Sequence, residues 1–245
     1  MLTLILPRRL GALAALILLT ACAVPTRPVL PTPAADSAGP SLAQRYADLQ
    51  ASTGGRLFRV DAAASQVRVH VFRAGRAARL GHNHVLSAPQ LNGWVLLPAE
   101  ALEGGRFELE FRLDQLELDA PAQRAALGPA WASALSAEAV AATKLNMLGE
   151  VGLQAERYPV VRLRGLQIVG AAPQLAVQVE VALHGQRQTQ WLALSTELTD
   201  DTALRTRGAL VLRQSDFGVQ PFSVAGGLLA VQDELVVTFE LVAKR

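Results

Sequence analysis

Apolar and polar residues alternate strictly over several stretches of this chain. At 107–113, Phe107, Leu109, Phe111 and Leu113 fall on one face, and two glutamates and an arginine fall on the other. A period of two residues is typical of a β-strand with one dry and one wet face. The same alternation at 66–71, 175–183 and 235–241 places on the apolar face Val67, Val69, Val71, Val177, Val179, Val181 and Phe239. Further strands are expected at 57–61, 91–97, 159–169, 188–198 and 206–213.

Turn-forming residues separate these stretches, among them Gly104-Gly105, His184-Gly185 and Gly226-Gly227. One segment, 121–147, is rich in alanine and lacks the alternation, so it predicts one or two short helices, with Ser136 as an N-cap. Short amphipathic strands at close spacing predict a closed up-and-down barrel or a sandwich. The chain is therefore predicted to be mainly β, with a helical insertion between its fourth and fifth strands.

Closure of the sheet decides what its apolar face can do. An eight-stranded barrel is wide enough either to be filled by side chains or to hold one small or elongated ligand. The inward residues are mostly aliphatic with few aromatics, which favours a cavity. The alternative is a filled core, as in a structural or stress-response interaction protein.

The N-terminus has the pattern of a bacterial lipoprotein signal. Arg8 and Arg9 precede an apolar run, 10–19, that is too short to span a membrane. The stretch Leu19-Thr20-Ala21-Cys22 resembles a lipobox, whose cysteine becomes the lipid-modified first residue of the mature chain. Cys22 is the only cysteine, and a lone thiol cannot form an intramolecular disulfide. We therefore expect residues 1–21 to be a signal peptide and Cys22 to carry a membrane anchor; ordinary cleavage with an incidental cysteine is the alternative.

The residues after Cys22 predict a tether followed by one domain. The segment 22–55 begins rich in proline and alanine and cannot bury a core, although 41–52 has the spacing of a short helix. The domain at 56–245 carries the strands.

By resemblance to the enterobacterial sorting rule, Ala23 after the cysteine favours an outer-membrane lipoprotein facing the periplasm. Without the two signal arginines, 21 basic residues balance 21 acidic ones, so no basic surface indicates nucleic acid.

Several motifs resemble the YceI-like family of bacterial periplasmic proteins. Tyr158-Pro159 is similar to the family's "YP" entry to a strand, and Leu183-His184-Gly185 is similar to its "LxxHGxT" hairpin. The stretch 213–219, RQSDFGV, resembles its "R-S-D-F-G-I" segment with Gln214 inserted. The end of the chain, 226–244, resembles its last two strands with a turn at Asp233-Glu234.

The opening stretch FRVDAAASQVRVHV also fits the family's first strands, with Ala64 where the family pattern has histidine. The resemblance implies an eight-stranded, lipocalin-like antiparallel barrel. It also implies that the apolar interior holds a polyisoprenoid or a similar amphiphilic lipid. We accordingly expect the ten apolar residues Val67, Val69, Val71, Phe107, Leu109, Phe111, Val177, Val179, Val181 and Phe239 to line a ligand cavity.

The motif Gly81-His82-Asn83-His84 departs from the family pattern and contains two of the four histidines. In an extended chain His82 and His84 would share a face and could converge on one ion, although a metal needs further ligands. The favoured interpretation places both imidazoles at the barrel mouth, with one or both hydrogen-bonded to backbone. A metal- or haem-binding envelope module that uses His82 and His84 is the alternative function; otherwise no cofactor is expected.

Arg213 and Asp216 are also expected at the barrel mouth, where Asp216 would act as a turn carboxylate and could pair with Arg213. Asp216-Phe217-Gly218 spells a kinase motif, but no phosphate loop or catalytic loop accompanies it. No GxSxG motif and no cysteine–histidine pair offers a nucleophile. The sequence therefore predicts a lipid-binding or lipid-carrying protein of the cell envelope rather than an enzyme.

Overall fold

The computed structural model describes residues 39–199 and 201–245. The predicted signal peptide, Cys22 and the first part of the tether lie outside the described residues. Among the described residues, no helix combines the length and apolar character that crossing a membrane requires.

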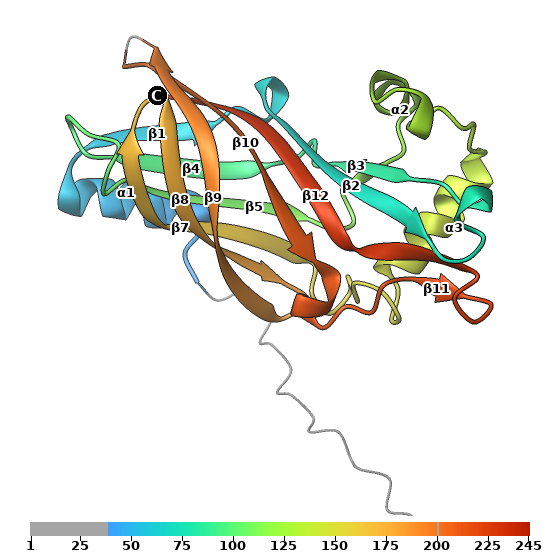
Figure 1. The fold of residues 1–245 in the computed structure, drawn as a ribbon. Coiled ribbons are helices and arrows are strands. Elements are labelled where there is room, and N and C mark those ends of the chain that lie inside the picture. The colour runs from blue at the N-terminus through green and yellow to red at the C-terminus, as the bar shows by residue number, and fades with distance from the viewer. Residues whose placement is uncertain (1–38, 200) are drawn as a thin grey trace, which may run out of the picture. The chain divides into compact units, whose positions relative to one another are not determined.

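Eight strands close into an antiparallel barrel (Figure 1). Around the barrel they are β1 (Arg56–Val60), β4 (Asn92–Leu97), β5 (Arg106–Arg112), β7 (Val160–Ala171), β8 (Gln174–Leu183), β9 (Gln186–Thr199), β10 (Ala203–Arg213) and β12 (Leu229–Lys244). The ring closes where β1 meets the end of β12, with Arg59 opposite Lys244. The predicted mainly β, eight-stranded barrel is confirmed.

A second run of strands branches from β12. Residues 230–240 of β12 pair with β2 (Gln66–Ala74), β2 pairs with β3 (His84–Ser87), and β3 pairs with the two-residue β6 (Glu117–Leu118). The two-residue β11 (Ser223–Val224) pairs with the beginning of β12. The short 3-10 helix η1 (Ala62–Ala64), capped by the Asp61 carboxylate, separates β1 from β2.

The turn expected at Asp233-Glu234 is wrong. Both residues lie inside the continuous strand β12, where the pairing with β2 shifts register between Val231 and Leu235. Asp233 accepts hydrogen bonds from the backbone N–H of Ser215 and from the Arg213 guanidinium. The bulge therefore directs this carboxylate to the segment that follows β10, and the strand continues past it.

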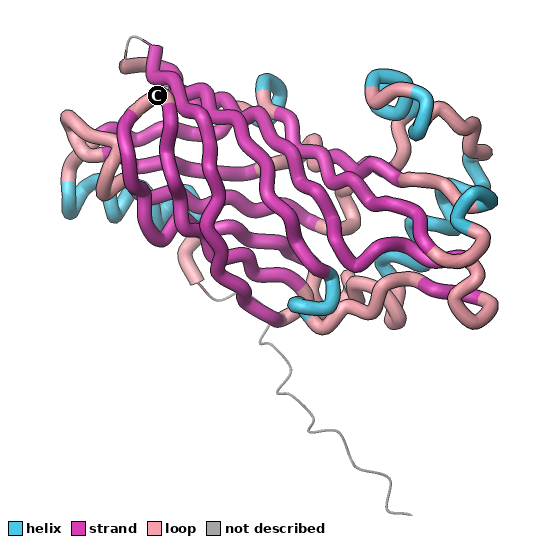
Figure 2. Tube along the Cα trace, in the orientation of Figure 1, coloured by secondary structure: helices cyan, strands magenta, loops and turns pink. Residues whose placement is uncertain are grey.

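The predicted helical insertion is confirmed. It consists of α2 (Pro121–Ala126), the 3-10 helix η3 (Pro129–Trp131) and α3 (Ala137–Leu148). The Ser136 hydroxyl caps α3 by accepting from the backbone N–H of Ala139. A further helix, α1 (Leu42–Thr53), packs Leu42 and Tyr46 against Leu96 on the outside of the barrel. Figure 2 shows these helical segments at the periphery of the sheet.

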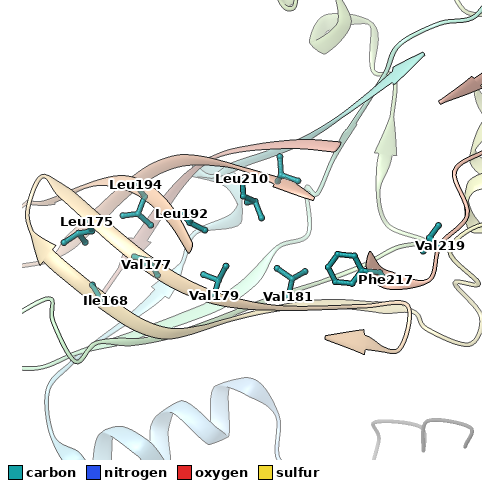
Figure 3. Close-up of a cluster of buried hydrophobic side chains, with 11 residues drawn as sticks. Ile168, Leu175, Val177, Val179, Val181, Leu192, Leu194, Leu210, Phe217 and Val219 are labelled. Carbon is teal, nitrogen blue, oxygen red and sulfur yellow. The ribbon is translucent and has the colours of Figure 1, made fainter. Parts of the chain in front are cut away.

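The core lies on the inner face of the barrel. Along β8 the alternating residues Val177, Val179 and Val181 are almost fully buried and form one row (Figure 3). They belong to a cluster that also includes residues of β7, β9, β10 and β12. Phe217 and Val219, which follow β10, extend this cluster toward one end of the barrel (Figure 3). The alternation of apolar and polar residues in the sequence thus corresponds to residues that alternate between the inner and outer faces of the barrel.

Candidate ligand-binding site

The barrel encloses an apolar cavity of about 700 Å³. Such a volume falls in the range of small-molecule binding sites, roughly 300–1,000 Å³. The alternative of a barrel filled by its own side chains would leave no such cavity. All ten residues that the sequence placed on the inner face line it: Val67, Val69, Val71, Phe107, Leu109, Phe111, Val177, Val179, Val181 and Phe239.

The cavity is long and follows the strands. Its lining along β8 runs from Leu175 to Leu183, a distance of about 27 Å at roughly 3.4 Å per residue. Toward one end the lining belongs to a packed cluster that includes Leu97 and Leu204; Phe58 of the same cluster is wholly buried and does not line the cavity. An elongated space of this kind suits a chain-like ligand better than a compact one.

The other end of the cavity has an exposed apolar rim. Val151, Phe222 and Val224 line the cavity and are also exposed to solvent, Val151 at 81%. Val224 belongs to β11 and Val151 follows α3, and Figure 1 places both elements at the same end of the barrel. The rim therefore marks the mouth through which a ligand would enter.

Two glycines make room for the aromatic rings of the cavity. A Cβ atom on Gly165 of β7 would lie 2.3 Å from the Phe107 ring, and one on Gly208 of β10 would lie 2.7 Å from the Phe239 ring. Each ring can therefore lie against the wall of the barrel and leave the lumen open. Sequence alternation identified the two phenylalanines but gave no signal for the glycines opposite them.

The GHNH motif lies at the start of β3, and only one of its histidines lines the cavity. His84 is the first residue of β3 and contributes to the lining together with Leu86, two positions further on. Before the motif, residues 78–80 form the 3-10 helix η2 (Ala78–Leu80), and the strand begins only at His84. His82 lies within hydrogen-bonding distance of the Ser133 hydroxyl, with Nδ1 3.0 Å from Oγ.

The favoured interpretation expected one or both imidazoles to form hydrogen bonds with the backbone, and this is wrong. The residue that bonds to the backbone is Asn83, which lies between the two histidines. Its side-chain amide donates to the carbonyl of Ala130 and its Oδ1 accepts from the backbone N–H of Arg73. His84 instead contacts a carboxylate, with Nδ1 2.6 Å from Oδ2 of Asp119. The motif thus fastens β3 to the segment 119–133 at the beginning of the helical insertion.

Asp119 is the centre of a buried polar cluster behind His84. Its side chain is 0% exposed, and it accepts hydrogen bonds from the backbone N–H of Val85 and from Nη1 of Arg124. Arg124, 6% exposed, also donates to the carbonyls of Asn83 and Ser133. Burial alone would raise the pKa of Asp119, but the hydrogen bonds from His84, Val85 and Arg124 outweigh it and hold the pKa below its usual value.

The first histidine of the motif, His82, has a different environment from His84. The pKa of His82 is lowered mainly by burial. The nearby His84, Arg124 and Arg73 lower it further through charge repulsion. Within residues 39–199 and 201–245, no group of three or more histidine, cysteine, aspartate or glutamate side chains could hold a metal ion. The described residues thus supply no third ligand for the metal alternative built on His82 and His84.

Arg213 and Asp216, which the sequence analysis expects at the barrel mouth, do not line the cavity. Arg213 pairs with Asp233 and Glu234, at 3.3 and 3.8 Å, and not with Asp216 as the sequence suggested. Asp216 lies in the 3-10 helix η4 (Gln214–Phe217), and its backbone carbonyl accepts from Gln188. Gln214, which the family pattern marks only as an insertion, lines the cavity.

The closed sheet and its enclosed apolar space define a lipocalin-like β-barrel with an internal cavity. The solved structure of BcnA from Burkholderia cenocepacia is similar, with a TM-score of 0.53, 15% identity, and 75% of this chain and 98% of BcnA covered. A polyisoprenoid-binding domain from Saccharophagus degradans is similar at a TM-score of 0.52 and 14% identity, over 76% of this chain and 97% of that domain. At this identity the likeness establishes the fold, and the YceI-like resemblance of the sequence fits it. Comparisons with family models and with curated proteins give no match.

Proposed function

We propose that this protein binds or carries an isoprenoid-like lipid inside its barrel. The observation that carries the proposal is the elongated cavity, whose walls are almost entirely aliphatic and aromatic. At about 0.8 kcal/mol per buried CH₂ group, ten carbons contribute on the order of 8 kcal/mol before ordering costs. The polyisoprenoid binding of the Saccharophagus degradans domain, which has the same fold, supports this choice of ligand.

The proposed place of action is the bacterial cell envelope. The lipobox-like sequence ending at Cys22 supports a lipid anchor, and Ala23 supports retention at the outer membrane on the periplasmic side. The anchored chain would keep the barrel close to a membrane that contains its ligand. In this proposal the ligand and the membrane are the partners, with no role for nucleic acid.

A binding role fits the cavity better than catalysis. Its lining offers hydroxyl, amide and imidazole groups but no cysteine, lysine or carboxylate among the described residues. Lipid affinity arises from apolar burial and requires no charged catalyst.

Native mass spectrometry tests the proposal on protein purified without detergent. We expect the full chain to carry a hydrophobic molecule that organic extraction removes, and the extracted protein to rebind an added polyprenol. An extracted protein that fails to take up polyprenols of any chain length would contradict the proposed function.

A further inference from the structure

The cavity contains one unusual side chain. Among the described residues that line it, His84 is the one whose side chain can ionise, while the other polar lining residues are neutral threonine, asparagine, glutamine and serine side chains. Alternation along β3 explains why His84 faces inward. Leu86, on the same face, lines the cavity, whereas Val85 between them points the other way and is wholly buried. An imidazole is thus held at the edge of an apolar lumen.

The contact with Asp119 fixes which ring nitrogen carries the proton. Nδ1 of His84 lies 2.6 Å from a carboxylate oxygen, so this nitrogen donates. In the neutral imidazole Nε2 is then a hydrogen-bond acceptor. Within the described part of the chain, no residue bonds to Nε2. The acceptor is therefore available to whatever occupies the cavity.

The charges around His84 are already balanced. Arg124 neutralises Asp119 at 2.7 Å, so the cluster needs no positive charge on the imidazole. No lysine or arginine is among the described residues that line the cavity. An anionic headgroup such as a phosphate would find no cation there, whereas an uncharged hydroxyl could donate to Nε2.

We propose that His84 is the anchor for the polar end of the ligand, and that it selects a lipid ending in an uncharged hydroxyl group. The hydroxyl donates to Nε2 while the apolar chain extends along β8 toward Phe58. Asp119 and Arg124 act as positioning residues that hold the imidazole in this tautomer. The inference rests on the proposed lipid-binding function and deepens it by naming the headgroup chemistry and the side chain that recognises it.

The test compares three headgroups on one chain: a polyprenol, its acetate ester and its monophosphate, each competing with a fluorescent apolar probe for the extracted full-length protein. The acetate can accept but not donate. We expect the wild type to bind the polyprenol about tenfold more tightly than the acetate, because the acetate cannot donate to Nε2 and leaves it unpaired; tenfold corresponds to about 1.4 kcal/mol. The monophosphate should also bind more weakly than the polyprenol.

The variant His84→Phe keeps a ring of similar shape and removes the acceptor. Its affinity for the polyprenol should fall about tenfold to the value for the acetate, while its affinity for the acetate stays unchanged. His82→Phe is the matched control, since His82 lies in the same motif but does not line the cavity; it should retain the preference for the hydroxyl. A melting curve checks that each variant is folded.

Three results would overturn the inference: equal binding of polyprenol and acetate by the wild type, tighter binding of the monophosphate, or a hydroxyl preference that survives in His84→Phe. The wild-type comparison stands even if the variant does not fold. A protein that binds all three lipids equally loses only this inference, whereas a protein that binds none of them refutes the proposed function as well.

Discussion

The substitution Val69→Trp is expected to weaken lipid binding more than tenfold while the barrel stays folded. Val69 lines the cavity, packs against two core clusters and is half-buried. An indole there would occupy the path of the chain. Displacing as few as two CH₂ groups costs about 1.6 kcal/mol, more than a tenfold loss of affinity. A competition titration with the fluorescent apolar probe measures this loss.

The matched control is Val211→Trp. Val211 is on β10, on the outer face of the barrel, and is 55% exposed. The same added ring should leave the affinity within about twofold, since surface changes away from special features act weakly. Unchanged binding by a folded Val69→Trp protein would show that the ligand lies somewhere other than the barrel lumen.

The substitution Asp119→Asn is expected to lower the free energy of unfolding by about 3–5 kcal/mol. It leaves Arg124 buried without a counter-charge and removes the carboxylate that orients His84. Asparagine is the suitable replacement, because Asp119 has a positive φ of 55° and asparagine tolerates that conformation. Urea denaturation at neutral pH measures the change. The exposed pair Arg205–Glu240 provides the control, and Glu240→Gln should cost less than about 1 kcal/mol.

The effect of Asp119→Asn should depend on pH in a defined direction. The pKa of Asp119 is lower in the folded protein than its usual value. Its contribution to stability is therefore fully present above the unfolded pKa of about 3.9 and is lost as the pH falls through the folded pKa. The difference between wild type and variant should stay constant from neutral pH down to about pH 5 and shrink below about pH 4. A difference that grows on acidification would contradict the assigned direction.

Much of the barrel could be predicted from the sequence because alternation reports directly on a two-sided sheet. Val67, Phe107 and Val177 fall on the apolar face by their spacing alone, and closure turns that face into the cavity lining. Ser136 could be recognised because an N-cap is a local interaction between a side chain and the next turn. The strand faces and the N-cap could be predicted because both depend on interactions between residues that are close together in the chain.

The buried polar cluster around Asp119 could not be predicted because it joins residues that are distant in the sequence. Asp119 and His84 are 35 residues apart, and neither has a pattern that points to the other. Strand β3 was missed because its four residues are too few to show a period. Asp233 resembles a turn residue in the sequence, because a bulge in a long strand and a turn use similar polar residues.

A structure of the extracted protein saturated with a polyprenol tests the central claim most directly. We predict one continuous, elongated ligand inside the barrel, with its hydroxyl end beside His84 and its chain running along Val181, Val179 and Val177 toward Phe58. An empty lumen at saturation, or a polyprenol bound on the outer surface, would contradict the account.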